Sequence, residues 1–151
     1  MNRQRGFTML ELLVVIAVIG IITITATPLF LSFVQAQQTR GAAQQVATLL
    51  NQARQLAIAR NRPVAVNPPA ALPANTIRFL FTTAVAGDVL CTDGSRCWRG
   101  PGTNDNGWMR LENQAVITGV TANPTFNSLG TAGGGTITVR NAQGSSTLDV
   151  V

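Results

Sequence analysis

Apolar residues dominate the first part of the chain. Leu12–Ile22 is apolar except for Gly20, and Glu11 is the only charged residue within residues 7–34. A helix of about 20 mostly apolar residues crosses the hydrocarbon core of a bilayer, whereas the apolar core of a secretory signal is only about 7–15 residues long. The pattern therefore predicts one membrane-spanning helix over residues 7–34.

Polar residues become frequent after this run, with many Gln, Ala, Arg and Thr over residues 35–62. Five residues in this stretch share three- and four-residue spacing: Ala43, Val46, Leu50, Ala53 and Ala57. The spacing predicts an amphipathic helix with a narrow apolar stripe that packs on a sheet. A coiled coil is the competing interpretation, but the stripe is short and rich in Ala. Asn61 and Pro63 are expected to end the helix.

Helical periodicity stops at Pro63, and residues 63–151 show the short β-branched or alternating runs that are typical of strands. These runs are Val64–Val66, Thr76–Thr83, Val116–Thr121, Thr136–Arg140 and Ser146–Val151. Turn sequences separate them: Asp93-Gly94, Asn106-Gly107, Gly133–Gly135 and Asn141–Gly144. We therefore expect an α+β fold, in which a long N-terminal helix continues into an amphipathic half that packs on small antiparallel sheets.

Four aromatic residues lie in or near the expected strands: Phe79, Phe81, Trp108 and Phe126. We expect them in the core rather than on a binding surface, because large aromatic side chains dominate small cores.

Charge is sparse. The 151 residues carry a formal charge of +5 from eleven basic residues, all Arg, and six acidic ones. Arg3 and Arg5 precede the apolar run and place the N-terminus in the cytoplasm by the positive-inside rule, with the C-terminal domain outside. The remaining charge is small, which favours a mildly cationic surface over a dedicated nucleic-acid patch.

The chain has no His and two Cys, Cys91 and Cys97. That set does not supply a zinc site, so no metal and no cofactor are expected. An oxidising compartment would favour a disulfide around the Asp93-Gly94 turn, and two free thiols are the alternative. Without His, and with Asp93 and Asp105 in turn sequences, no catalytic constellation is apparent, so we expect neither an enzyme nor a small-molecule substrate.

Glu11 is the most informative polar residue, because a carboxylate within an apolar run costs about 2.5–3.5 kcal/mol at mid-membrane. It either reaches the interface or is retained for a partner charge. The residues around it, Arg-Gly-Phe-Thr-Met-Leu-Glu-Leu from Arg5 to Leu12, resemble the type III signal of type IV pilins and type II secretion pseudopilins.

This resemblance implies that residues 1–6 are a leader, which a prepilin peptidase removes between Gly6 and Phe7, and that Phe7 is N-methylated. It also implies that Glu11 faces the Phe7 amino group, its own or a neighbour's, when subunits assemble in a helical fibre at the inner membrane. Pro28 matches the helix-weakening proline of many pilins.

A second resemblance covers residues 49–64, where Ala53-Arg54, Ala57-Ile58, Arg60-Asn61 and Val64 are similar to the helix-end pattern of the GspH/FimT family of minor pseudopilins and minor pilins. FimT-like members that bind DNA resemble one another in a basic tail. In this chain Arg140 is the only basic residue among the last forty residues. DNA contact would therefore depend on four arginines: Arg96, Arg99, Arg110 and Arg140.

Three functions follow from these patterns. The favoured one is a minor subunit of a type II secretion pseudopilus or type IV pilus, acting in initiation or at the tip. A DNA-binding minor pilin of natural transformation is the second. A single-pass membrane-anchored sensor or binding domain is the third, although a plain anchor has no need of Gly6, Phe7 and Glu11 together.

Overall fold

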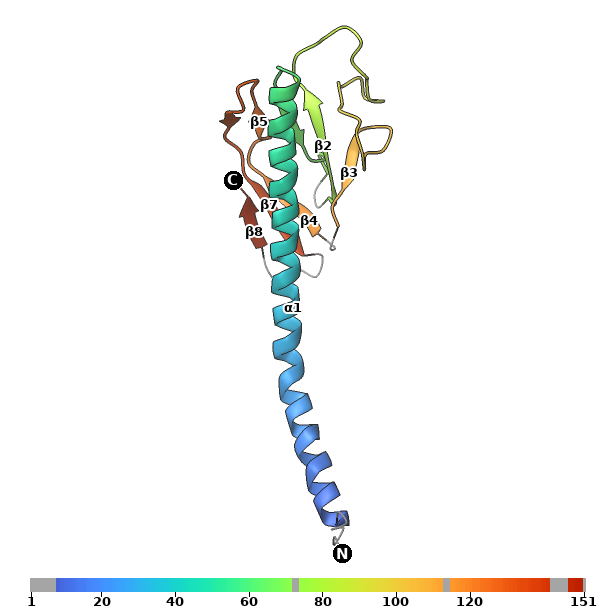
Figure 1. Ribbon diagram of the computed structural model, residues 1–151, viewed down its shortest axis with the longest axis vertical. Helices are drawn as coiled ribbons and strands as arrows, with labels where there is room; N and C mark the ends of the chain where they lie inside the picture. The colour runs from blue at the N-terminus through green and yellow to red at the C-terminus, as the bar shows by residue number, and fades with distance from the viewer. Residues whose placement is uncertain (1–7, 72–73, 113–114, 142–146, 151) are drawn as a thin grey trace, which may run out of the picture. The chain divides into compact units, whose positions relative to one another are not determined.

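The computed structural model describes residues 8–71, 74–112, 115–141 and 147–150. One helix, α1 (Met9–Ala59), is followed by strands in two antiparallel sheets (Figure 1). The chain divides into two compact units, residues 1–34 and 35–151. The expected α+β class, with the later part of a long helix packed on small sheets, is confirmed.

The described part of the first unit is apolar helix. Among the side chains described between Met9 and Phe33, the large apolar ones are about half exposed or more. By length and composition, α1 is able to cross a membrane. The helix continues through Pro28, although proline lacks the N–H that would bond to the carbonyl of Ile24.

The end of α1 is capped by Asn61, whose φ of 49° is left-handed. The N–H of Arg62 donates to the carbonyl of Ala57 at 3.1 Å, and the N–H of Asn61 donates to the carbonyl of Ile58 at 3.1 Å. These two bonds form a Schellman motif, so Asn61 ends the helix as expected.

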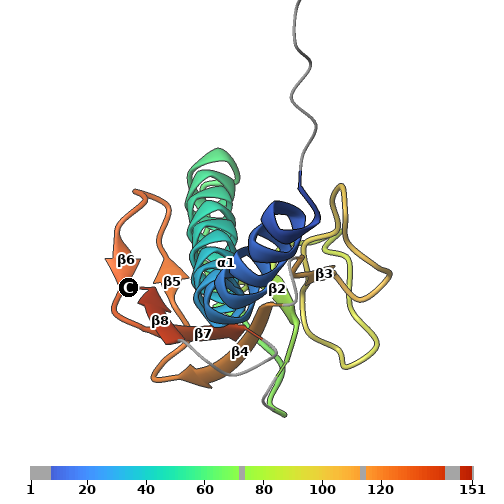
Figure 2. The same ribbon diagram turned by 90° about the horizontal axis from the view of Figure 1, so that it is seen from below.

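The larger sheet has the strand order β3-β2-β1-β5-β6. Its strands are β1 (Val64–Asn67), β2 (Thr76–Phe81), β3 (Trp108–Arg110), β5 (Thr125–Phe126) and β6 (Ala132–Gly133). The smaller sheet has the order β4-β7-β8, with β4 (Ala115–Val120), β7 (Ile137–Asn141) and β8 (Thr147–Val150). Figure 2 shows β3 and β6 at opposite margins of the strand layer around the later part of α1.

Both sheets contribute to one core against the C-terminal part of α1. The expected stripe is confirmed, since all five of its residues are buried, and Ala42 and Leu49 widen it. Fully buried partners from the strands include Val64, Ile77, Phe79, Ile117 and Val139. Alanines on the stripe bring the helix close to the strands, which suits a thin two-layer core.

The strand predictions differ from the structure in two ways. The second strand ends at Phe81 rather than Thr83, because the chain then turns back toward Pro63, whose carbonyl accepts the N–H of Thr82. Strands β3, β5 and β6 were not predicted. Each has only two or three residues, too few to show an alternating pattern.

The aromatic prediction holds for three of its four residues. Phe79 and Phe126 are buried and Phe81 is partly buried against the core, whereas Trp108 is half-buried outside the core cluster. The rings of Phe81 and Trp108 each lie under a guanidinium, which explains how a large ring remains near solvent. Trp98, which was not predicted, also packs against the core, with its ring centre 5.7 Å from that of Phe79.

Candidate assembly site

The N-terminal end of α1 presents Glu11 in its first turn. Glu11 is exposed, and its backbone N–H donates to the hydroxyl of Thr8 at 3.2 Å. Thr8 is therefore the N-cap, and Glu11 is three residues beyond it, where a carboxylate favours the positive end of the helix dipole. The geometry gives Glu11 a local helix-stabilising role in addition to any partner charge. Gly6 and Phe7 lie outside the described residues.

Three threonines precede Pro28 on the apolar helix: Thr23, Thr25 and Thr27. Each hydroxyl donates to a backbone carbonyl one turn earlier, as Thr23 does to Ile19 at 2.8 Å and Thr27 does to Thr23 at 2.7 Å. These internal bonds satisfy the hydroxyls within the helix, so the polar atoms do not need water. The threonine hydroxyls therefore present no unsatisfied donor on the surface of this apolar helix.

A disulfide links Cys91 and Cys97, with their Cα atoms 5.8 Å apart, as the sequence predicts. The ring places Asp93 beside β2, where its carboxylate accepts a 2.7 Å hydrogen bond from Arg78. Bonds from the Ser95 hydroxyl first, and then from Arg78, hold the pKa of Asp93 well below its usual range. The disulfide ring is therefore anchored to the sheet by a charge pair as well as by covalent geometry.

Arg78 is 9% exposed, and its guanidinium lies 4.4 Å from the centre of the Trp108 ring. The side chain thus bridges Asp93 on one side and an aromatic face on the other. Cation–π contact of this kind is worth about 0.5–2 kcal/mol. It joins β2, β3 and the disulfide ring into one unit.

A second charge cluster joins the end of α1 to the loop after β2. The Arg62 guanidinium donates to both oxygens of Asp88, at 2.6 and 2.8 Å, and also to the carbonyl of Thr83. The N–H of Val85 donates to Asp88 at 2.9 Å, and Arg96 lies 3.6 Å from it. The bond from Arg62, followed by that from Val85, lowers the pKa of Asp88 to about 2.

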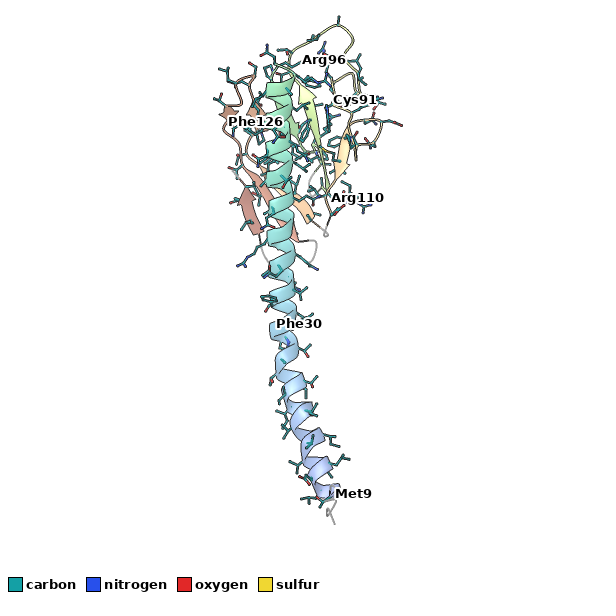
Figure 3. All side chains as sticks on the ribbon, in the orientation of Figure 1. Met9, Phe30, Cys91, Arg96, Arg110 and Phe126 are labelled. Atoms are coloured by element: carbon teal, nitrogen blue, oxygen red, sulfur yellow. A yellow bond between two sulfur atoms is a disulfide. The ribbon has the colours of Figure 1, made fainter. Side chains whose placement is uncertain are left out.

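The arginines expected at a DNA surface do not gather at one place. The carbonyl of Arg96 accepts the N–H of Phe81 at one end of β2, whereas Arg110 pairs with Thr76 at the other end. The two partner residues, Phe81 and Thr76, are five steps apart on β2, or about 17 Å. Figure 3 shows Arg96 and Arg110 at different levels of the domain.

Arg99 lies near Arg96, because it donates to the carbonyl of Leu90 at 3.3 Å and Leu90 pairs with Arg96 in a β-bridge. Arg140 is apart from both, half-buried on β7 in the smaller sheet. A continuous basic track would need these side chains on one face. In the described part of the chain, no group of three or more His, Cys, Asp or Glu side chains is placed to hold a metal ion.

Two family models match this chain. The prokaryotic N-terminal methylation motif matches residues 1–27, and the type II transport protein GspH matches residues 42–151. The second match covers more than half of the chain. The chain belongs to the GspH family.

Curated relatives of this GspH-family chain match a short segment. Fimbrial protein Q of Moraxella bovis is 46% identical over 39 residues, which is 26% of this chain and 25% of that protein. The type IV major alpha-pilin of the same organism is also 46% identical over 39 residues, covering 24% of its length. The similarity thus spans about a quarter of each pilin. No solved structure matches the chain.

Both family matches extend into α1, because the methylation motif ends at Thr27 in the apolar part and the GspH match begins at Ala42. This GspH-family chain is therefore pilin-like in both halves. The helix cap at Thr8 and the pairing of Arg62 and Arg78 with Asp88 and Asp93 were not predicted from the sequence. The first had a signal, the Ser/Thr-x-x-Glu pattern at Thr8–Glu11; the ion pairs had none, because their members are 26 and 15 residues apart.

Proposed function

We propose that the protein is a minor pseudopilin or minor pilin, a structural subunit that enters a helical fibre and acts in its initiation or at its tip. The observation that carries this proposal is the presence, on one chain, of an N-terminal methylation motif over residues 1–27 and a GspH domain over residues 42–151. Neither description names an enzyme, and the subunit is proposed to be non-catalytic.

In this proposal residues 1–6 are a leader in the cytoplasm, and a prepilin peptidase cuts between Gly6 and Phe7. Residues 7–34 then form the membrane and assembly helix, residues 35–62 its amphipathic continuation, and residues 63–151 the β-rich domain outside the cytoplasmic membrane. Arg3 and Arg5 support this orientation by the positive-inside rule.

Glu11 is proposed to meet the charged amino group of Phe7, its own or that of a neighbouring subunit, when helices pack together. In a low-dielectric helix bundle the two charges offset each other's desolvation. Pro28 is proposed to weaken the helix and let its apolar part adjust during packing.

The test is co-purification of the full chain with the pilins or pseudopilins encoded beside it. Intact mass of the membrane-extracted protein should match a chain that starts at methylated Phe7. Crosslinking in cells should then place it in oligomers with those subunits. A chain that retains Met1, or one that is processed but remains monomeric under crosslinking, would contradict the proposal.

A further inference from the structure

A groove lies between the open edges of the two sheets. It has a volume of about 440 Å³ and is bounded by the glycine run after β6 on one side, Val150 of β8 on another, and the Ala47–Arg54 part of α1. Both β6 and β8 are the terminal strands of their sheets. The backbone edges on the two sides of the groove therefore have no strand beyond them in the described part of the chain.

The β6 edge lacks the features that usually keep an edge from pairing. Edge strands are commonly protected by charges, proline or a covering element. The opposite edge of the larger sheet carries the exposed Arg110, and β8 carries the exposed Asp149. Ala132 and Gly133 of β6 are exposed and uncharged, and no atom lies within 4 Å of the position that a Cβ of Gly134 would take. Another backbone can therefore approach this edge closely.

Most of the described residues that line the groove are apolar or glycine, and Arg54 is the one charged residue among them. Leu50 and Phe126 are buried core residues that reach it, together with Ala47 and Pro124. Arg54 lines the same groove beside Gly130 and forms no ion pair among the described residues, whereas Arg62, Arg78 and Arg96 each have an Asp partner. An unpaired guanidinium beside an apolar surface favours a ligand that carries one carboxylate.

The groove continues along α1. A neighbouring hollow of about 390 Å³ shares Ala47 and Val150 with it and reaches Arg40. Arg40 and Arg54 are about 21 Å apart along the helix, a length that six or seven extended residues span. Asp149 lines the same hollow as Arg40. Arg54, in contrast, has no acidic residue among the described residues that line its groove, so it is the cation open to a ligand carboxylate.

We propose that this groove binds an extended segment of a fellow subunit, which adds as a strand to β6 and places a carboxylate on Arg54. The main chain of the segment pairs with the glycine edge, its alternate apolar side chains enter the groove, and the charge fixes its register. The assignment of this segment to a fellow subunit rests on the proposed function. The preference of the groove for an extended, carboxylate-bearing segment does not depend on the proposed function.

The chemistry is tested with the full chain in detergent and two fluorescent peptides. The probes are acetyl-TVTDTVT-amide, in which both Val side chains and the Asp share one face of an extended strand, and a twin with Lys in place of Asp. Both are titrated by anisotropy. The Asp peptide should bind at least about tenfold more tightly than the Lys peptide. Arg54→Glu should reverse that preference. Arg60→Glu, a charge reversal at an exposed residue that directly follows α1 and lies outside the groove, should leave it unchanged.

Gly134→Pro should weaken the binding of both peptides, since proline removes a backbone N–H and adds bulk. The thermal midpoint of this variant shows whether it is folded. Arg54→Glu on α1 tests the groove independently of the glycine run. Equal binding of the two peptides, an equal effect of Arg60→Glu, or no saturation up to about 1 mM would overturn the proposal.

The source is tested in cells by replacing Ala132 with the photo-crosslinker p-benzoylphenylalanine, with Thr92 on the disulfide ring as the control site. Crosslinks to co-expressed tagged subunits should form from Ala132, should not form from Thr92, and should fall with Arg54→Glu. If the protein co-purifies with the fibre but Ala132 gives no crosslink, the groove proposal fails while the proposed function stands. If the peptides bind but the protein never joins other subunits, the proposed function fails, and with it the assignment of the segment to a fellow subunit.

Discussion

Both oxygens of the Asp88 carboxylate accept hydrogen bonds from the Arg62 guanidinium, at 2.6 and 2.8 Å. Arg62 directly follows the capped end of α1, and Asp88 lies in the loop after β2. The pair therefore ties a loop that exposes Val85, Val89 and Leu90 to the end of the helix. The side chains are only 11% and 13% exposed, so the pair is shielded from most of the solvent.

Asp88→Asn should lower stability at neutral pH and flatten its dependence on acid. The folded pKa of Asp88 is about 2, below the ordinary value of 3.8, so the carboxylate stabilises the fold at pH above about 4. That contribution is lost as the pH falls from about 4 to about 2. Urea unfolding followed by Trp fluorescence at pH 7, 4 and 2.5 measures it. Asp105→Asn, in an exposed turn, is the control, and an equal acid dependence in both variants would contradict this assignment.

Gly107→Ala should destabilise the protein more than Gly94→Ala. Both glycines have positive φ, 73° and 76°, and a left-handed Ala costs about 1–2 kcal/mol. A Cβ on Gly94 meets nothing within 4 Å, but one on Gly107 would lie 2.8 Å from the carbonyl oxygen of Trp98 and 2.9 Å from Cβ of Cys97. Overpacking adds about 1–3 kcal/mol. Denaturant midpoints of the two variants compare these costs directly. Equal midpoints would show that the residues around the disulfide shift to accommodate the added Cβ without a measurable loss of stability.

Breaking the disulfide should cost about 2 kcal/mol, because a ring closed over a separation of six residues restricts the unfolded chain only modestly. Non-reducing peptide mapping should find Cys91 linked to Cys97. Unfolding with and without reductant gives the magnitude, and a Cys91→Ser/Cys97→Ser chain should not respond to reductant. Thiol labelling of both cysteines before reduction would contradict the link.

Glu11→Leu should insert in the membrane and be processed, yet fail to enter a fibre. Removal of the carboxylate makes the span more apolar, so insertion is not impaired. In the packed helices the Phe7 amino group would lose its partner, and an unpaired buried charge costs about 3–5 kcal/mol. Glu11→Gln, which keeps its shape and hydrogen bonding, should be intermediate.

Fractionation of sheared fibres measures the effect of the Glu11 variants, with membrane level and Phe7 processing as controls. Thr8→Ala supplies a further comparison, because it removes the helix cap without removing the charge. If Thr8→Ala matches Glu11→Leu, the role of Glu11 is helix capping rather than pairing.

DNA binding should be weak and strongly dependent on salt. Arg96 and Arg110 lie at opposite ends of β2, and Arg96 is partly neutralised by Asp88. Scattered phosphate contacts lose most of their affinity by about 0.2 M salt. Electrophoretic mobility shifts of the full chain in detergent, at about 0.05 and 0.2 M salt, measure this. Tight binding at the higher salt, abolished by Arg96→Ala or Arg110→Ala alone, would favour DNA uptake instead.

Long periodic segments were predictable because their signal repeats along the chain. The buried stripe from Ala43 to Ala57 and the helix end at Asn61 follow from local rules of amphipathicity and capping. The five predicted strand runs all contain strands, with ends that shift by one or two residues. The disulfide was expected because the two cysteines lie close together in sequence around the Asp93-Gly94 turn.

The sequence by itself determined the membrane-length helix, its buried stripe and the α+β class, since each depends on spacing within one segment. Only the tertiary structure decided that β3, β5 and β6 exist, because strands of two or three residues are stable only through partners elsewhere in the chain. It also decided that Trp108 lies under Arg78 and that Arg54 has no carboxylate partner among the described residues. Contacts between residues that are far apart in sequence depend on which surfaces the folded core brings together, and no local pattern encodes that choice.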